Sequence, residues 1–463
     1  MAFDIKSLIQ ARLGENYDLH DRHINRALVK VLRTIGFDKV YARAEGAYLY
    51  DREGKDYLDG LGGYGAVNIG RNHPVVKKAI ADLLAMDMPN MVQMDCSILS
   101  GLLAEALLKR FPPHLNAVFF CNSGTEAVEG AIKFARCATG RNKLLFFDRA
   151  FHGLTTGALA MNGTGMFLEG FGELLPSKAI PMDDLAVLEK ELATREYAAF
   201  FVEPVQGKTV KYPADDSYYQ QAQALCRKYG TLLVTDEIQV GMGRTGKFSS
   251  FEHWNLEPDI VPIAKSLSGG LVPCGAILTR REIYDKTFSR MDRCVVHSTT
   301  FGRNNLAMAA ALATLQVMDD EKVVENSARM GNALIDGLKG LAAKHEFIKE
   351  VRGKGLIVAI EFQEPKSLRL RAAWKMIQAA EKGLFAQAVV IQLLKDHRVL
   401  TQVSARHLEV IKITPVLTIG QKEVDRIVNA VDASLAECYK FPGPLWEMGA
   451  NLVKASLSVK KST

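Results

Sequence analysis

Between residues 117 and 279, the chain alternates short apolar runs with amphipathic helical patterns. A helical pattern at 125–136 follows the first run. Continuous apolar strands are typical of a parallel sheet that is buried on both faces, with helices as the crossovers. The sequence therefore predicts an α/β fold whose large, mostly parallel sheet is covered by helices. The apolar runs that predict its strands are 117–121, 144–148, 198–204, 232–237, 260–264 and 274–279.

The two ends of the chain follow different patterns. Residues 36–58 alternate in polarity around an Asp-Arg-Glu-Gly turn, which predicts a small sheet, and residues 60–70 are glycine-rich, which predicts a loop lining a site. After about residue 320, long helices alternate with strands, which predicts a smaller α+β domain built with the N-terminal segment. We expect an N-terminal segment that joins the small domain, a large domain, a C-terminal small domain and a basic amphipathic tail, at residues 1–60, 61–320, 321–440 and 441–463.

Composition excludes several classes of protein. The chain has 463 residues, of which 48% are hydrophobic, so it can bury a large core. Its net charge of +6 is mild and dispersed, which argues against nucleic-acid binding. Seven cysteines without a CxxC pair argue against a disulfide or metal framework. The N-terminus lacks the apolar core of a signal peptide, and no stretch approaches the roughly 20 apolar residues of a membrane span. We expect a cytoplasmic protein without a metal.

A carboxylate and a lysine follow two of the apolar runs. Asp236 lies near the end of residues 232–237, and Lys265 follows residues 260–264. Ligand sites gather where parallel strands end. A lysine amine can form a Schiff base with pyridoxal 5′-phosphate, and a carboxylate can keep the pyridine nitrogen protonated. Taken singly, Asp236 is equally an ordinary strand-end carboxylate and Lys265 a solvated lysine, but together they predict a pyridoxal-phosphate site.

The segment Asn-Ser-Gly-Thr-Glu-Ala (122–127) joins a strand to a helix. Ser123 and Glu126 have the spacing of a capping box, and Gly124 allows the backbone to approach a ligand closely. The N–H groups at such a helix N-terminus can bind a phosphate. The alternative is an ordinary helix cap that contains a glycine.

Other loop residues allow two interpretations each. Phe151, in Phe-His-Gly (151–153), could stack on a planar ring or belong to the core. Gln239 could bind the ring hydroxyl or be a surface amide. The hydroxyls of His-Ser-Thr-Thr-Phe-Gly (297–302) could contact a phosphate or cap their own loop.

Together these segments resemble the class III pyridoxal-phosphate aminotransferases of fold type I, which include ornithine, 4-aminobutyrate and ω-amine transaminases. The resemblance runs from about residue 36 to 438 and implies a pyridoxal-phosphate-dependent transaminase. Besides the motifs above, it rests on Glu-Pro-Val-Gln-Gly (203–207), Asp-Glu-Ile-Gln-Val-Gly-Met-Gly-Arg-Thr-Gly (236–246) and Ala-Lys-Ser-Leu-Ser-Gly-Gly (264–270).

The resemblance implies roles for the matched residues. Lys265 would form the Schiff base and move the substrate proton, and Asp236 would pair with the pyridine nitrogen. The amino group would wait on pyridoxamine phosphate between two half-reactions. The family's sites lie at a dimer interface, so a homodimer with shared sites is implied. The remaining residues implied to contact the cofactor are Ser123, Gly124, Thr125, Phe151, His152, Glu203, Ile238, Gln239 and Thr300, of which Thr300 would reach the site of the partner subunit.

The sequence departs from the family on the substrate side. Many amino-acid-specific members grip the α-carboxylate with an arginine where this chain has Lys412, and pair that arginine with a glutamate where it has Lys208. Two ammonium groups about 4 Å apart would repel by about 4 kcal/mol at an effective dielectric constant of about 20. Either one lysine points away, or the pocket holds an anion in both half-reactions. Arg303 and Asn305 also replace the usual glycine and proline near the partner-subunit loop.

These departures predict an amine, or its aldehyde or ketone counterpart, whose reacting carbon lacks a carboxylate. The substrate could be lipid-like, with Tyr64 lining its channel, and the second substrate would be a common amino acid and its 2-oxo acid. Leu445, Met448 and Leu452 lie near one helical face of the tail, which could bind a membrane surface or pack on the small domain. The competing functions are a class III decarboxylase, racemase or aminomutase, and a non-catalytic lipid-surface binding protein.

Overall fold

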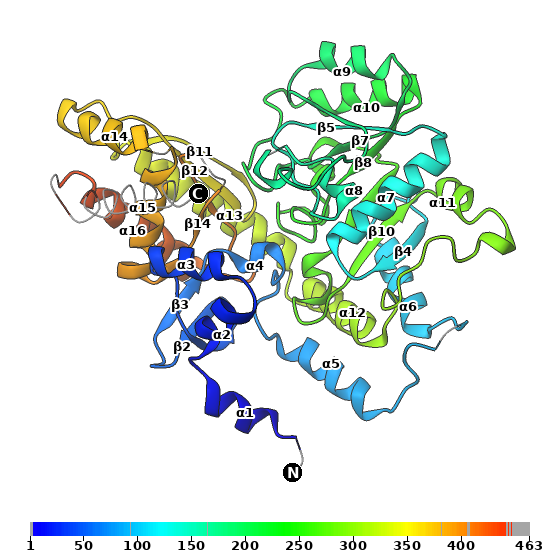
Figure 1. Ribbon diagram of the computed structural model, residues 1–463, viewed down its shortest axis with the longest axis horizontal. Coiled ribbons are helices and arrows are strands. Elements are labelled where there is room, and N and C mark those ends of the chain that lie inside the picture. Colours follow the sequence, from blue (N-terminus) through cyan, green and yellow to red (C-terminus); the bar gives the residue numbers. More distant parts are fainter. Residues whose placement is uncertain are drawn as a thin grey trace.

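A seven-stranded sheet forms the core of the body that lies on the right in Figure 1. The computed structural model describes residues 3–92, 94–163, 165–380, 382–404, 408–440, 443 and 446. The strand order is β4-β10-β9-β8-β7-β5-β6, and β10 alone runs antiparallel to its neighbours β4 and β9. The predicted, mostly parallel sheet is confirmed. Its strands are β4 (Ala117–Cys121), β5 (Lys143–Phe147), β6 (Ser177–Ile180), β7 (Tyr197–Val202), β8 (Leu232–Thr235), β9 (Ile260–Ile263) and β10 (Gly275–Thr279).

Both faces of this sheet are buried, as continuous apolar strands require. Leu144 and Phe146 of β5 pack in the cluster that contains the buried side of α7 (Gly124–Thr139). Leu145 and Phe147 belong to the cluster on the other face, because side chains alternate along a strand. The helices around the sheet include α5 (Pro74–Ala85), α6 (Ile98–Leu108), α8 (Thr156–Leu159), α9 (Leu185–Leu192), α10 (Tyr218–Tyr229), α11 (Arg281–Thr287) and α12 (Asn305–Asp320).

The two ends of the chain meet in a second, four-stranded sheet with the order β1-β2-β3-β13. The N-terminal strands β2 and β3 form the predicted hairpin, and the C-terminal strand β13 runs parallel to β3. This pairing brings residues 58–59 beside residues 399–400. The domain boundaries drawn from the sequence stay a prediction. The strands are β1 (Tyr41–Glu45), β2 (Tyr48–Asp51), β3 (Asp56–Asp59) and β13 (Val399–Leu400).

A third sheet, with the order β11-β12-β15-β14, packs against α13 (Val323–Ala342). These strands lie in the region after residue 320 where the sequence predicts helices alternating with strands. Its strands are β11 (Ile348–Lys354), β12 (Ile357–Phe362), β14 (Gln402–Val403) and β15 (Val410–Ile413). The other helices of this region are α14 (Leu368–Ala380), α15 (Leu384–His397) and α16 (Gln421–Glu437).

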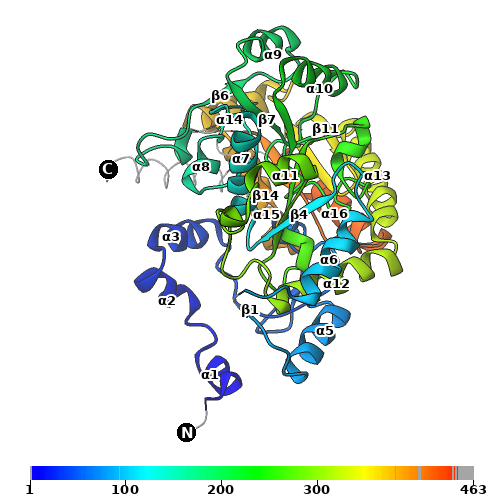
Figure 2. The same cartoon turned by 90° about the vertical axis from the view of Figure 1, so that its right-hand side faces the viewer.

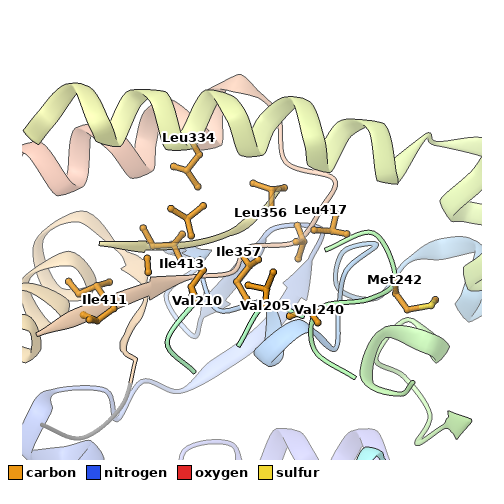
Figure 3. Packing of buried hydrophobic residues seen from close by; sticks show 14 of the residues in the cluster. Val205, Val210, Val240, Met242, Leu334, Leu356, Ile357, Ile411, Ile413 and Leu417 are labelled. Atoms are coloured by element: carbon orange, nitrogen blue, oxygen red, sulfur yellow. The ribbon is translucent and has the colours of Figure 1, made fainter. Parts of the chain in front are cut away.

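One hydrophobic cluster joins this third sheet to loops of the large sheet. Figure 3 shows Ile411 and Ile413 of β15 in the same cluster as Val205 and Val210. Lys412 lies between the two isoleucines, so its side chain leaves the opposite side of the strand. That side faces Gly207, whose carbonyl oxygen accepts a hydrogen bond from Lys412 Nζ at 2.8 Å. The join between the two regions therefore brings Lys412 close to the end of β7.

Three short helices form an N-terminal arm that projects from the body (Figures 1 and 2). They are α1 (Ile5–Arg12), α2 (Asn16–His23) and α3 (Arg26–Ile35). In the described part of the chain, no helix combines the length and apolar character needed to cross a membrane. Most of the predicted amphipathic tail, including Leu445, Met448 and Leu452, lies outside the described residues.

The glycine-rich stretch at residues 60–70 contains one short turn of helix, α4 (Gly62–Gly65), as well as the predicted irregular backbone. Within α4, Gly63 and Tyr64 have φ values of 57° and 58°, in the left-handed region. A tyrosine rarely adopts that conformation. The surrounding contacts hold Tyr64 there, because its carbonyl oxygen accepts a hydrogen bond from Gln239 Nε2 at 3.1 Å.

Candidate active site

Parallel strands bring Asp236 and Lys265 to the same edge of the large sheet. Asp236 directly follows β8, and Lys265 follows the neighbouring β9 after one residue. Both line a cavity of about 280 Å³. The other described residues that line it are Gly124, Thr125, Phe151, His152, Gly153, Leu154, Glu203, Ile238 and Gln239.

Lys265 presents an amine that is only weakly held as an ammonium ion. Burial lowers its pKa to about 8, although the charges of Asp236 and Glu203 act in the opposite direction. Among the described residues, Lys265 Nζ makes no hydrogen bond and no ion pair. The residue also has a φ of 51°, a left-handed conformation that is strained for lysine. A deprotonated amine that faces a cavity can act as a nucleophile or as a base.

Asp236 is held on both of its oxygens. Oδ2 lies 2.7 Å from His152 Nδ1, and Oδ1 accepts the backbone N–H of Ile238 at 3.0 Å. Burial alone would lower the pKa of His152, but its hydrogen bond to Asp236 and the charges of Asp236 and Glu203 raise it. The raised pKa favours the imidazolium form of His152, and the hydrogen bond from Nδ1 fixes the orientation of the Asp236 carboxylate.

The N-terminus of α7 lies beside the cavity. Ser123 caps this helix, as predicted, since its Oγ accepts the N–H of Glu126 at 3.3 Å. The reciprocal half of the capping box differs, because Glu126 Oε2 accepts the N–H of Asn122 at 2.6 Å. A Cβ at Gly124 would lie 2.8 Å from Ile238 Cγ2, so only glycine fits there without a shift. The helix end can therefore offer backbone N–H groups to an anion.

Glu203 and Gln239 form one polar side of the cavity. Glu203 is buried, and its oxygens accept the N–H groups of Phe151 at 3.0 Å and Gly207 at 2.7 Å. Burial raises the pKa of Glu203. Phe151, which could stack on a planar ring, and Ile238, which the resemblance implies to contact the cofactor, both line the same cavity.

The two lysines of the substrate side have separate environments. Lys412 is 3% exposed and donates to Gly207, whereas Lys208 Nζ lies 4.3 Å and 4.2 Å from the ring centroids of Phe151 and Phe167. Burial lowers the pKa of Lys412 to about 7, and the nearby charge of Lys265 adds to this effect. Burial also lowers the pKa of Lys208, to about 8. Neither ammonium forms an ion pair with a carboxylate within the described ranges.

Tyr64 and Thr300 lie in different places. Tyr64 is half-exposed beside Gln239, and its ring centroid lies 6.0 Å from Lys412 Nζ. Thr300 is exposed and lines another cavity together with Arg303. A single chain therefore gathers the other predicted cofactor residues around one edge of the sheet, but leaves Thr300 outside the cavity that contains Lys265.

Arg244 is fully buried near the site and was not predicted from the sequence. Its guanidinium donates to Leu356 O at 2.9 Å, to Pro415 O at 2.5 Å and to Asn68 Oδ1 at 2.6 Å. These bonds tie the loop after Asp236 to the third sheet. The only sequence signal for Arg244 is its place in the quoted motif 236–246. Leu154, which lines the cavity while 55% exposed, carried no such signal.

The residues present suit pyridoxal 5′-phosphate. They combine an amine without a hydrogen-bond partner among the described residues, a buried carboxylate 2.7 Å from a histidine nitrogen, and a helix N-terminus. These groups meet the needs of the aldehyde, the pyridine nitrogen and the phosphate, respectively. Phe151 and Ile238 supply apolar surface for the ring.

Comparisons with known proteins agree with this geometry. A family model described as aminotransferase class-III matches residues 34–435. Among curated proteins, the aminotransferase PigE of Serratia sp. (strain ATCC 39006) is 33% identical over 448 residues. That alignment covers 90% of this chain and 52% of PigE, so the chain spans about half the length of this relative.

Solved structures of similar shape cover nearly the whole chain. The ornithine aminotransferase of Toxoplasma gondii is 28% identical with a TM-score of 0.81, and the alignment covers 95% of this chain and all of that one. An amine transaminase from an uncultivated Pseudomonas species is 29% identical with a TM-score of 0.76. That alignment covers 86% of this chain and 95% of the amine transaminase.

Proposed function

This chain belongs to the class III aminotransferase family, whose cofactor is pyridoxal 5′-phosphate, and from this premise we propose that it moves an amino group between an amine and an aldehyde, ketone or 2-oxo acid. The observation that carries the proposal is the shared cavity of Lys265 and Asp236. The Lys265 amine has a lowered pKa, and the Asp236 carboxylate is held by His152.

Each residue has a definite task in this proposal. Bound pyridoxal phosphate withdraws electrons from the amine-bearing carbon and carries the amino group between the two substrates. Lys265 Nζ holds the cofactor at rest and, once released, takes the proton from that carbon and returns it. Asp236, oriented by His152, keeps a proton on the pyridine nitrogen. The N-terminus of α7 binds the phosphate.

The amine substrate, in this proposal, lacks a carboxylate on its reacting carbon. Among the described residues that line the cavity, none is an arginine, and Lys412 lies where a carboxylate-binding arginine is expected. Lysine lacks the rigid fork with which arginine binds a carboxylate. Phe151, Leu154 and Ile238 give the cavity an apolar wall, which suits an alkyl or lipid-like amine. The structural neighbour from an uncultivated Pseudomonas species, which is named as an amine transaminase, supports the same substrate class.

We further propose that two copies of the chain share their sites. Thr300 is exposed and lies outside the cavity that contains Lys265. A second copy could bring its Thr300 to the phosphate, as the family resemblance implies. Sedimentation of the purified holoenzyme, with and without a Thr300→Arg change, tests the proposal. A monomer with full activity would contradict it.

A single-turnover assay tests the proposed reaction. The holoenzyme is mixed with simple alkyl amines, ornithine or 4-aminobutyrate, and the cofactor's absorbance change is followed. We expect the alkyl amines to react faster, and the amino group to appear on an added 2-oxo acid. Faster reaction of ornithine or 4-aminobutyrate would contradict the substrate class. Loss of carbon dioxide, or racemisation without amino transfer, would contradict the aminotransferase itself.

A further inference from the structure

We propose that Lys208 is a positioning residue for the cofactor: its ammonium lies in a corner formed by the rings of Phe151 and Phe167 and holds Phe151 against the cofactor ring. The inference rests on the proposed function, in which Phe151 supplies apolar surface for that ring. It concerns a position at which this chain has lysine where many amino-acid-specific members have glutamate. The three side chains together are called the aromatic corner below.

The Lys208 ammonium lies behind Phe151 as seen from the cavity. Phe151 is among the described residues that line the cavity of Lys265, and neither Lys208 nor Phe167 is. Lys208 Nζ lies over the Phe151 ring, 4.3 Å from its centroid. An aromatic ring has two faces, so an ammonium that occupies one face leaves the other for a planar ligand. Lys208 therefore contacts Phe151 without taking space from the cofactor.

The second ring of the corner comes from another segment of the chain. Phe167 ends the short 3-10 turn η1 (Gly165–Phe167), which lies between α8 and β6. Its centroid lies 4.2 Å from Lys208 Nζ and 5.8 Å from the centroid of Phe151, with the two ring planes 67° apart. One ammonium is thus attracted to the faces of two rings at once. The attraction links the loop after β7, which carries Lys208, to the segments that carry the two rings.

The backbone beside Phe151 is held by separate contacts. Its N–H donates to Glu203 Oε1 at 3.0 Å, and Gly153 O accepts a hydrogen bond from Asn162 Nδ2 at 3.2 Å. Lys208 Nζ donates to Asn162 Oδ1 at 3.4 Å, which is long for a hydrogen bond. Within the described ranges, Lys208 forms no ion pair with a carboxylate. The two rings are therefore the closest support of the ammonium, and the ammonium restrains the side chain of Phe151.

The charge at position 208 decides whether the corner can form. The faces of an aromatic ring carry negative partial charge, so they attract an ammonium and repel a carboxylate. A glutamate at this position would face two such rings and could not hold them together. An arginine could, because its guanidinium stacks on aromatic faces. This sign of charge makes the corner testable by substitution.

A second lysine beside two aromatic rings provides a matched control. Lys354 Nζ lies 4.8 Å from the ring centroid of Tyr212 and 5.0 Å from that of Trp254. None of these three residues is among those that line the cavity of Lys265. Lys354 therefore makes the same kind of contact without a link to the cofactor.

Cofactor binding, rather than turnover, tests the corner. The apoprotein is titrated with pyridoxal phosphate at about pH 7, below the Lys208 pKa of about 8, so that the Lys208 amine is charged. Fluorescence quenching gives the dissociation constant, and the visible circular dichroism of the bound cofactor reports how firmly its ring is oriented. Lys208→Met should raise the dissociation constant by about threefold to tenfold and weaken the dichroism, because Phe151 can then turn.

A double-mutant cycle identifies the partner through which Lys208 acts. Phe167→Leu should raise the dissociation constant by a similar factor, and the double variant should lie within about twofold of the weaker single variant. Lys208→Arg should stay within about twofold of the unchanged protein, and Lys208→Glu should bind at least as weakly as Lys208→Met. Lys354→Met should lower the stability but change neither cofactor measurement. Lys208→Gln replaces Lys208→Met in the cycle if the methionine variant does not fold.

Three results would overturn the corner. They are unchanged binding and dichroism in Lys208→Met, effects of Lys208→Met and Phe167→Leu that multiply in the double variant, and an unchanged apoprotein that binds no pyridoxal phosphate. Multiplied effects would mean that Lys208 acts through Asn162 or by its charge at a distance. Neither measurement needs a substrate. If alkyl amines fail to react while the cycle shows coupling, the proposed substrate class falls and the corner stands.

Discussion

The cofactor side and the substrate side of this site are built differently. Asp236 and Lys265 follow adjacent strands of one sheet, and the carboxylate is held on both oxygens. Lys412 and Gly207 meet across 205 positions of sequence, at the join between two sheets. There, Lys412 is buried without a carboxylate partner in the described chain. In the proposed function, the large sheet therefore positions the residues that hold the cofactor, while the join between the sheets positions a residue of the substrate side.

The largest expected effect tests the cofactor side. Lys265→Ala removes the only amine that we assign to proton transfer, and the single-turnover rate with an alkyl amine should fall by about 10⁴-fold. Lys190→Met is the matched control and should react at the original rate. A Lys265→Ala enzyme that retained a tenth of the activity would mean that another group moves the proton.

The next effect tests the carboxylate. Asp236→Asn keeps the size and a hydrogen bond to His152 but removes the charge, so the same rate should fall by about 10²-fold. Asp259→Asn is a control at the opposite end of β9, where Asp259 Oδ2 accepts the N–H of Leu233 at 2.9 Å. It should lower stability without a comparable loss of rate. Equal losses of rate in both variants would show that the Asp236 charge has no special role.

A smaller effect concerns the substrate side: the lowered pKa of Lys412 should make the free energy of unfolding depend on pH. The pKa of Lys412 is about 7 in the folded chain and about 10.4 in an unfolded one, so between these values the unfolded chain binds more protons. The free energy of unfolding should then rise with pH through this window, by up to about 1.4 kcal/mol per unit. The cost of burying Lys412 is greatest below about pH 7 and disappears above about pH 10.4.

Urea unfolding of the unchanged enzyme and of Lys412→Met, across this pH range, measures that slope. The difference in unfolding free energy between the two should grow with pH in favour of the unchanged enzyme. Lys190→Met should give a flat difference, because its side chain is exposed. A flat difference for Lys412→Met as well would show that its pKa is not lowered.

The smallest effect compares two helix caps. Ser123→Ala removes the N-cap of α7, and Asp184→Ala removes the N-cap of α9. In α9, Asp184 Oδ1 accepts the N–H of Val187 at 2.9 Å. Each should lower the unfolding free energy by about 1 kcal/mol. Only Ser123→Ala should also weaken pyridoxal-phosphate binding, measured by fluorescence titration of the apoprotein. Equal affinities in the two variants would remove Ser123 from the phosphate site.

The structure gathers the predicted cofactor residues other than Thr300 at one edge of the large sheet, and the sequence signals for these residues are local. Each strand of the large sheet except the short β6 is predicted by an apolar run. The carboxylate and the lysine that follow two of these runs indicate the chemistry of the site. Strand β11 was missed because Lys349, Glu350 and Arg352 interrupt its apolar pattern. Burial of Arg244 could not be predicted either, because arginine is rarely buried and its three acceptors come from distant segments.

The substrate side depended on contacts that no local pattern encodes. The sequence predicts that Lys208 and Lys412 repel each other in one pocket. It leaves open whether one lysine points away or an anion lies between them. The structure separates the two lysines, since Lys208 Nζ lies 4.2 Å from the ring centroid of Phe167, while Lys412 Nζ donates to Gly207 O. Both contacts join residues that are far apart in the sequence.

Lys208, Lys265 and Lys412 all have lowered pKa values, and of these three only Lys265 lines the cavity that contains Asp236, so we propose that Lys265 binds the aldehyde. Borohydride reduction of the holoenzyme, followed by peptide mass spectrometry, tests this claim most directly. The account predicts the reduced cofactor on Lys265. An adduct on Lys208 or Lys412, or none on the chain, would contradict it.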